Sequence, residues 1–249
     1  MPAKFNDLFN HLLSEHSVSS TNPDIDQSNL GVINLLAETF EGLGFTCELV
    51  PVDGVGQGEH EKTNLIATLG SGPGGLVLSG HTDTVPFNES LWDTNPLAMT
   101  EKDNKLFGLG ATDMKGFFAV VHEAIQGIQD ADLKQPLIIL ATADEESSMA
   151  GARTLANLGK PKARAAVIGE PTSLRPIHMH KGIMMESIHV QGQSGHSSNP
   201  ALGRNALEAM HEVIGALIKF RLQLQSKYNN PHFDIDVPTI NLGVIHGGD

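Results

Sequence analysis

Apolar side chains recur along the chain with two different periods. Spacings of three and four residues predict amphipathic helices, and short continuous apolar runs predict buried strands. The helical pattern covers residues 5–16, 28–43, 116–128, a segment beginning near Ala150, and 205–225. The apolar runs cover residues 45–52, 64–69, 75–79, 136–143 and 165–169. Because these strands alternate with helices, the pattern predicts an α/β fold, with a mixed and mostly parallel sheet and flanking helices.

A glycine-rich loop joins the second and third predicted strands. Gly70, Gly72 and Gly75 match the G-x-G-x-x-G spacing of dinucleotide-binding proteins. However, Pro73 lies inside the loop, and a strand follows where the dinucleotide motif requires a helix. We therefore interpret the loop as the turn of a hairpin, and nucleotide binding is not supported.

The character of the sequence changes after Lys181. Residues 182–192 alternate between apolar and polar side chains, which predicts a half-exposed strand. The alternating segment with Ile240, Leu242 and Val244 predicts another, and the long helical pattern lies between the two. We therefore expect two domains, over residues 1–181 and 182–249.

Composition restricts the classes of function. The 249 residues are 40% hydrophobic and 18% charged, as in an ordinary globular protein. Sixteen Lys and Arg against 29 Asp and Glu give a net charge of −13, which argues against nucleic acid or an anionic membrane as the main partner. The single cysteine, Cys47, excludes an intramolecular disulfide and a cysteine metal cage. No signal segment or membrane-spanning apolar run is present, so we expect a soluble cytoplasmic protein.

Acidic and imidazole side chains recur where the apolar strands end. Because strand ends at the carboxyl edge of an open α/β sheet form one crevice, these groups are expected to converge. A pair of divalent cations about 3.5–4 Å apart, bridged by one carboxylate, would relieve their mutual repulsion. Imidazole and carboxylate ligands without thiolate suit zinc, and also cobalt or manganese. The groups are His81 with Asp83, Asp113 in the following loop, Glu145 with Glu146, and Glu170.

Each of these groups also has a simpler interpretation. Asp113 precedes a predicted helix and could cap it. Glu145 and Glu146 could be solvated side chains at a strand end, and Glu170, before Pro171, could belong to a turn. Their repeated position at strand ends favours the metal site.

Four ordered motifs resemble those of the dinuclear zinc aminoacylase and carboxypeptidase family. They are SGHTDTVP at residues 79–86, GLGATDMKG at 108–116, ADEE at 143–146 and GEPT at 169–172. Within the family, the closer resemblance is to the branch that deacetylates N-acetylornithine. It rests on DNKL at residues 103–106, ATADEE at 141–146, HKG at 180–182 and GQSGHSS at 192–198, and the match runs over nearly all of the chain.

The resemblance implies a metal ligand set. His81 and Glu170 would bind one zinc ion, and Asp113 would bridge it to a second ion. Glu146 would bind that second ion, and Asp83 would orient His81. Cobalt is the alternative metal.

The resemblance also implies the catalytic and substrate-binding groups. Glu145 would be the general base, and His196 would stabilise the oxyanion, in this family often from the other subunit of a homodimer. His180 and Lys181 would lie near the substrate. The implied reaction is hydrolysis of N-acetylornithine to ornithine and acetate, in arginine biosynthesis.

Family members continue beyond residue 249, complete a lid domain and return to the catalytic domain with a further histidine ligand. We therefore expect residues 1–181 to form a metal-dependent catalytic domain lacking its C-terminal part. Residues 182–249 would form part of an α+β ferredoxin-like lid that also makes the dimer. Such an incomplete chain would hold only one metal ion tightly.

Other functions remain open at this point. The chain could be a succinyl-diaminopimelate desuccinylase, a related aminoacylase, or a non-catalytic metal-binding or dimerisation fragment. A serine hydrolase is disfavoured because residues 192–196 lack the final glycine of G-x-S-x-G. A single-zinc protease is disfavoured because the sequence has no H-E-x-x-H motif.

Overall fold

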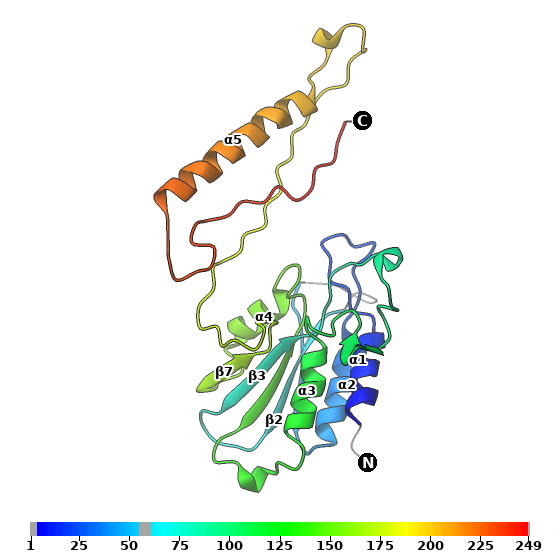
Figure 1. The fold of residues 1–249 in the computed structure, drawn as a ribbon, viewed down its shortest axis with the longest axis vertical. Coiled ribbons are helices and arrows are strands. Elements are labelled where there is room, and N and C mark those ends of the chain that lie inside the picture. The colour runs from blue at the N-terminus through cyan, green and yellow to red at the C-terminus, as the bar shows by residue number, and fades with distance from the viewer. Residues whose placement is uncertain (1–3, 55–60, 249) are drawn as a thin grey trace. The chain divides into compact units, whose positions relative to one another are not determined.

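The computed structural model describes residues 4–54 and 61–248. They form two compact units, one up to Arg175 and one from Pro176 (Figure 1). This division falls shortly before the boundary expected after Lys181. The assignment of the units as catalytic and lid domains remains a prediction.

A five-stranded sheet with the order β1-β2-β6-β3-β7 forms the centre of the first unit. β2 is antiparallel to both β1 and β6, whereas β3 pairs in parallel with both β6 and β7. Four of the five strands therefore run in one direction, as the prediction of a mixed, mostly parallel sheet requires. The strands are β1 (Thr46–Pro51), β2 (Thr63–Leu69), β3 (Leu76–His81), β6 (Leu137–Thr142) and β7 (Ala165–Ile168).

The hairpin expected between β2 and β3 does not form, because β6 lies between these two strands. The glycine-rich residues 70–75 therefore connect two strands that are not neighbours. Six residues easily cover the roughly 10 Å between next-nearest strands, so the loop needs no tight turn. The central place suits β6, whose continuous apolar run is buried on both faces at Ile138 and Ile139.

Helices cover both faces of this sheet, and the alternation of β2 separates the two layers. Leu65 and Ala67 belong to the apolar cluster formed with α1, α2 and α3, whereas Ile66 packs with Leu155 of α4 on the other face (Figure 1). The four helical patterns that fall in the first unit are confirmed. The helices are α1 (Phe5–Ser14), α2 (Leu30–Glu41), α3 (Gly116–Ala124) and α4 (Ala150–Leu158).

A short hairpin was not anticipated from the sequence. β4 (Thr100–Lys102) and β5 (Lys105–Phe107) pair antiparallel. The two residues between them, Asp103 and Asn104, have φ values of 53° and 57°. Asp and Asn tolerate this left-handed conformation, which a two-residue turn of this kind requires. The Asp-Asn dipeptide was the feature of the sequence that could have predicted the turn.

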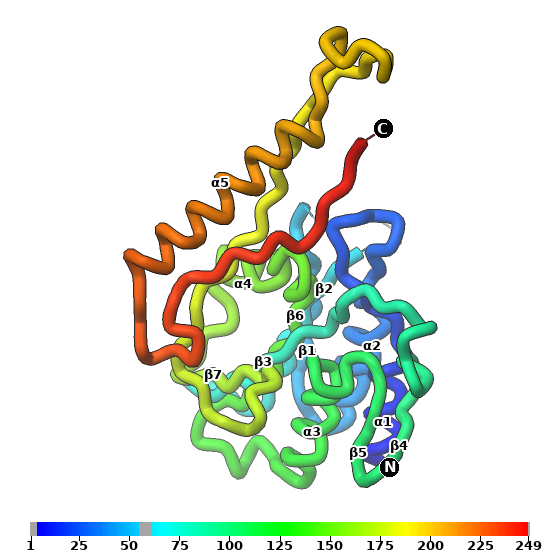
Figure 2. The backbone as a smooth tube through the Cα atoms, turned by 45° about the horizontal axis from the view of Figure 1, so that its top comes forward, coloured from blue at the N-terminus to red at the C-terminus, as the bar shows by residue number. Residues whose placement is uncertain are grey.

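The second unit is organised around α5 (Ala206–Lys227), which confirms the long predicted helix. The strands expected over residues 182–192 and 240–244 are wrong, because the structure describes both segments without strand pairing and the ribbon has no arrow there (Figure 1). Figure 2 traces the two segments as tubes, yellow before α5 and red after it. Alternation alone does not make a strand when no neighbouring chain takes up its backbone hydrogen bonds. The ferredoxin-like lid therefore remains a prediction. Among the described helices, none has the length and apolar character needed to cross a membrane.

Candidate metal centre

The parallel strands place the predicted acidic and imidazole groups at one edge of the sheet. β3 ends at His81 and is followed by Asp83. β6 is followed by Glu145 and Glu146, and β7 is followed by Glu170. Because these three strands run in the same direction, their carboxyl ends and the loops that follow them lie together.

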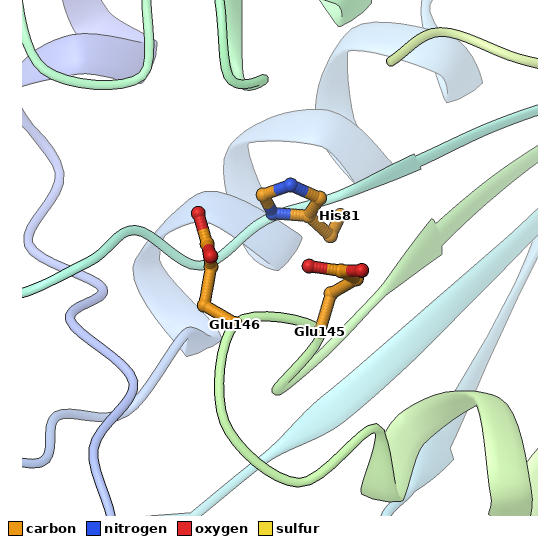
Figure 3. Close-up of side chains that lie close together, drawn as sticks. All are labelled: His81, Glu145 and Glu146. Atoms are coloured by element: carbon orange, nitrogen blue, oxygen red, sulfur yellow. The ribbon is translucent and has the colours of Figure 1, made fainter. Parts of the chain in front are cut away.

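His81 lies at the centre of the resulting cluster and is buried. Its Nε2 atom is 3.0 Å from Asp113 Oδ1 and 3.8 Å from Glu170 Oε1. Ligand atoms of His81, Asp113 and Glu170 lie within 4.8 Å of one another. The same holds for His81, Glu145 and Glu146, whose side chains gather in Figure 3. The structure thus brings together five of the predicted site residues.

Asp83 contacts both His81 and the loop that carries the two glutamates. The Nδ1 atom of His81 is 3.0 Å from the backbone carbonyl oxygen of Asp83 and 3.6 Å from its Oδ1. Since a carbonyl oxygen only accepts, Nδ1 carries a proton, and Nε2, which faces Asp113 and Glu170, is the ring nitrogen that a metal ion would bind. The Asp83 carboxylate accepts hydrogen bonds from the backbone N–H groups of Glu145 at 3.1 Å and Glu146 at 3.0 Å.

Asp113 does not cap α3. The helix begins after Lys115, which makes no side-chain capping bond. The carboxylate of Asp113 is bonded to His81 instead and is 51% exposed, so it remains accessible to a ligand. Lys115 is buried and donates from Nζ to the backbone oxygen of Glu15 at 2.7 Å, and burial lowers its pKa to about 8.

The carboxylates of the cluster outnumber its one imidazole, so their negative charges repel one another. Burial raises the pKa of Glu146 to about 7, and the nearby charge of Asp113 adds to this rise. Burial also raises the pKa of Glu170. Burial by itself lowers the pKa of His81, but the neighbouring carboxylates, first Asp83 and then Glu170, raise it overall. A cation would relieve this repulsion, and one imidazole with several carboxylates fits a divalent metal ion.

Three predicted site residues belong to the second unit. The exposed His196 places Nδ1 2.7 Å from the hydroxyl of Ser198. The exposed His180 donates from Nδ1 to the backbone oxygen of Lys181 at 2.8 Å. Lys181 donates from Nζ to the backbone oxygen of Val237 at 2.9 Å. These contacts all lie within the second unit, and the roles of the three residues remain predictions.

A buried polar network lies beside the loop that carries Glu145 and Glu146, and no pattern in the sequence predicts it. Lys62, Ser19 and Asp144 are all buried and contact one another through Asp144. Asp144 lies inside the ADEE motif, but its role was not anticipated. In the sequence, Lys62 is marked only as a charged residue just before an apolar run, which does not predict its burial.

Comparison with known proteins places this cluster in a family. The sequence model of peptidase family M20/M25/M40 matches residues 77–233, which include the whole cluster. The chain belongs to this family. The resemblance drawn from the ordered motifs is thereby confirmed.

Within the M20/M25/M40 family, the curated relatives include acetylornithine deacetylases. The chain is 53% identical over 246 residues to the acetylornithine deacetylase of Photorhabdus laumondii. It is 51% identical over 245 residues to that of Klebsiella pneumoniae. Each alignment covers 98% of this chain and 63% of the relative, so the chain spans under two thirds of the relatives' length.

Solved structures of two peptidases share the fold. A tripeptidase from Staphylococcus aureus aligns with a TM-score of 0.53 and 20% identity, covering 86% of this chain and 57% of the other. Human carnosine dipeptidase 1 aligns with a TM-score of 0.52 and 23% identity, covering 66% of this chain and 36% of the other. At this identity the likeness supports the fold alone.

Proposed function

We propose that the protein is a metal-dependent deacetylase that hydrolyses N-acetylornithine to ornithine and acetate. The observation that carries the substrate is the 53% identity to a curated acetylornithine deacetylase over 98% of this chain. The cluster around His81 supports the chemistry, because it offers imidazole and carboxylate ligands at one edge of the sheet. Zinc is the proposed native metal, with cobalt as a substitute.

The residues of the cluster divide into two proposed ligand groups. His81 and Glu170 would hold one ion, and Asp113 would bridge to the other. Glu146 would hold the second ion. When bound, such ions polarise an acyl carbonyl and lower the pKa of a water molecule. The carboxylate of Asp83 contributes indirectly, since it fixes the backbone of the loop that carries Glu146.

Glu145 is the proposed general base. Its backbone N–H is held by Asp83, and its side chain points toward His81 beside that of Glu146 (Figure 3). In this role its carboxylate accepts the proton of the attacking water and passes it to the departing amine. His196 is proposed to stabilise the oxyanion, and His180 and Lys181 to contact the substrate. A homodimer made through the second unit and a cytoplasmic location complete the proposal.

A comparison of two substrates tests the proposal. A full-length version of the protein, supplied with zinc or cobalt, should show a higher kcat/KM for N-acetylornithine than for N-succinyl-diaminopimelate. The succinyl compound carries two more carboxylates than N-acetylornithine, and these need cationic contacts of their own. A preference for it would move the protein to the desuccinylase branch. Tight metal binding without turnover of either substrate would instead support a non-catalytic metal-binding protein.

A matched pair of variants separates the general base from a ligand. Glu145→Gln should retain metal binding and lower kcat by at least ~10²-fold, because the proton acceptor is removed. Glu146→Gln should weaken metal binding itself. Wild-type turnover by Glu145→Gln with intact metal content would show that another group accepts the proton.

A further inference from the structure

A buried lysine lies beside the loop that carries the two glutamates. Lys62 directly precedes β2, and only 1% of its side chain is exposed. Its Nζ atom donates to Asp26 Oδ1 at 2.9 Å and to the backbone oxygen of Gln27, and it lies 3.1 Å from Asp144 Oδ1. These three acceptors match the three protons of an ammonium group. Such pairing is what makes the burial of a charged group tolerable.

The Asp144 carboxylate that faces Lys62 belongs to the residue immediately before Glu145. Its Oδ1 atom also accepts a hydrogen bond from Ser19 Oγ at 2.9 Å, and Ser19 in turn contacts the hydroxyl of Ser147. The backbone of Asp144 has a φ of 57°, a conformation that non-glycine residues rarely adopt. The turn that follows β6 therefore begins at Asp144 and is anchored by the side chain of this residue.

The same turn is held from its other side by Asp83. Its carboxylate accepts the backbone N–H groups of Glu145 and Glu146. The turn is thus fixed at three consecutive residues, once through a side chain and twice through the backbone. From this turn, the side chains of Glu145 and Glu146 reach toward His81 (Figure 3).

We propose that Lys62 and Ser19 are positioning residues that hold the turn at Asp144, and through it Glu145 and Glu146, in the geometry of the metal centre. This inference rests on the proposed function, because it gives the two glutamates their roles. Without Lys62, the carboxylates of Asp26 and Asp144 would lose their shared buried counter-charge. An uncompensated buried charge is strongly unfavourable, so Asp144 would turn toward water and displace the residues that follow it.

The test measures metal binding rather than turnover. Zinc affinity is determined by titration, and the visible absorption of bound cobalt reports the geometry of its ligands. Lys62→Met should lower zinc affinity about 10- to 100-fold and change the cobalt spectrum, as for other residues that orient metal ligands. Lys62→Arg, which keeps the charge, should recover part of the affinity. Ser19→Ala should cause a smaller loss, because Lys62 still contacts Asp144.

A core variant controls for general loss of stability. Leu36 is fully buried in α2 and belongs to the apolar cluster under the sheet. Leu36→Ala should destabilise the fold while leaving zinc affinity and the cobalt spectrum unchanged. An equal loss of affinity in Leu36→Ala and Lys62→Met would overturn the inference, because Lys62 would then be merely structural.

The outcomes also separate the inference from the proposed function. Wild-type protein that binds neither zinc nor cobalt would refute both. Wild-type protein that binds metal, together with Lys62→Met and Ser19→Ala variants of the same affinity and spectrum, would overturn the inference alone. If Lys62→Met does not fold, Ser19→Ala decides: reduced affinity supports the positioning role, and wild-type affinity refutes it.

Discussion

The two units of the chain treat similar apolar side chains very differently. Phe40 of α2 is 0% exposed in the core of the first unit, whereas Phe220 of α5 is 49% exposed. α1 buries four residues in ten, while α5, which is described along its whole length, buries none of its 22 residues. The helical pattern was recognised equally well in both. Burial depends on a neighbouring surface, which the sheet of the first unit supplies to its helices.

The strands show the same difference. β2 pairs on both edges, and its alternating side chains enter two separate apolar clusters. Residues 182–192 instead alternate between apolar and polar side chains, yet the structure describes them without a strand partner. An alternating pattern therefore predicts a strand only where a second strand takes up its backbone groups. The comparison between the units can be tested by identical substitutions made in each.

The largest contrast is expected for phenylalanine truncation. Phe40→Ala should lower the free energy of unfolding of the first unit by about 3–5 kcal/mol, because it opens a cavity in a closed core. Phe220→Ala should change stability by less than about 1 kcal/mol, because the ring is half exposed. Urea unfolding of both variants measures the difference. Equal losses would mean that Phe220 is packed at an interface.

Histidine substitutions sharpen the same contrast at the level of metal binding. His81→Ala should lower zinc affinity by more than ~100-fold, since it removes the group shared by both candidate ligand sets. His211→Ala, on the exposed surface of α5, should leave zinc affinity unchanged. Titration with zinc after removal of bound metal measures both. Retained tight binding in His81→Ala would place the metal elsewhere.

Local patterns in the sequence predicted most elements of the first unit and the residues gathered around His81. Strand ends that carry His81, Glu145 and Glu170 meet because parallel strands share an edge. This inference needs the direction of the strands but not their order. The order itself was not predictable, because the place of β6 between β2 and β3 depends on pairing between residues far apart in the sequence.

The network around Lys62 could not be predicted from the sequence for a related reason. Lys62, Ser19 and Asp144 come from three distant segments, and no spacing rule connects them. A lysine before an apolar run is usually exposed, so its burial follows only from the carboxylates that surround it. The prediction of strands over residues 182–192 and 240–244 was wrong because an alternating pattern carries no information about a pairing strand.

Glycine substitutions should have opposite signs in the two units. A Cβ atom at Gly151, at the start of α4, would lie 2.5 Å from the backbone oxygen of Ala143. Gly151→Ala should therefore destabilise the first unit by about 1–3 kcal/mol. A Cβ atom at Gly215 of α5 meets no atom within 4 Å of the described structure, so Gly215→Ala should stabilise the helix by about 0.5–1 kcal/mol.

Urea unfolding measures the effect at Gly151, and amide hydrogen exchange along α5 measures the effect at Gly215. Slower exchange in Gly215→Ala is the expected result. Faster exchange would mean that residue 215 packs closely against another surface in solution. A neutral Gly151→Ala would show that α4 shifts away from β6 without cost.

The smallest expected effect concerns how the two helices begin. The side chain of Asn205 accepts hydrogen bonds from the backbone N–H groups of Leu207 at 2.9 Å and Glu208 at 3.2 Å. α1 begins after Lys4, which makes no such bond, and is held instead by its buried face. Asn205→Ala should cost α5 about 1 kcal/mol, whereas Asn205→Ser should retain most of the cap. Amide exchange of residues 206–209 should quicken in Asn205→Ala, while Lys4→Ala leaves exchange in α1 unchanged. Unchanged exchange in Asn205→Ala would show that α5 is held by packing after all, and the contrast between the two units would then be smaller than their exposure implies.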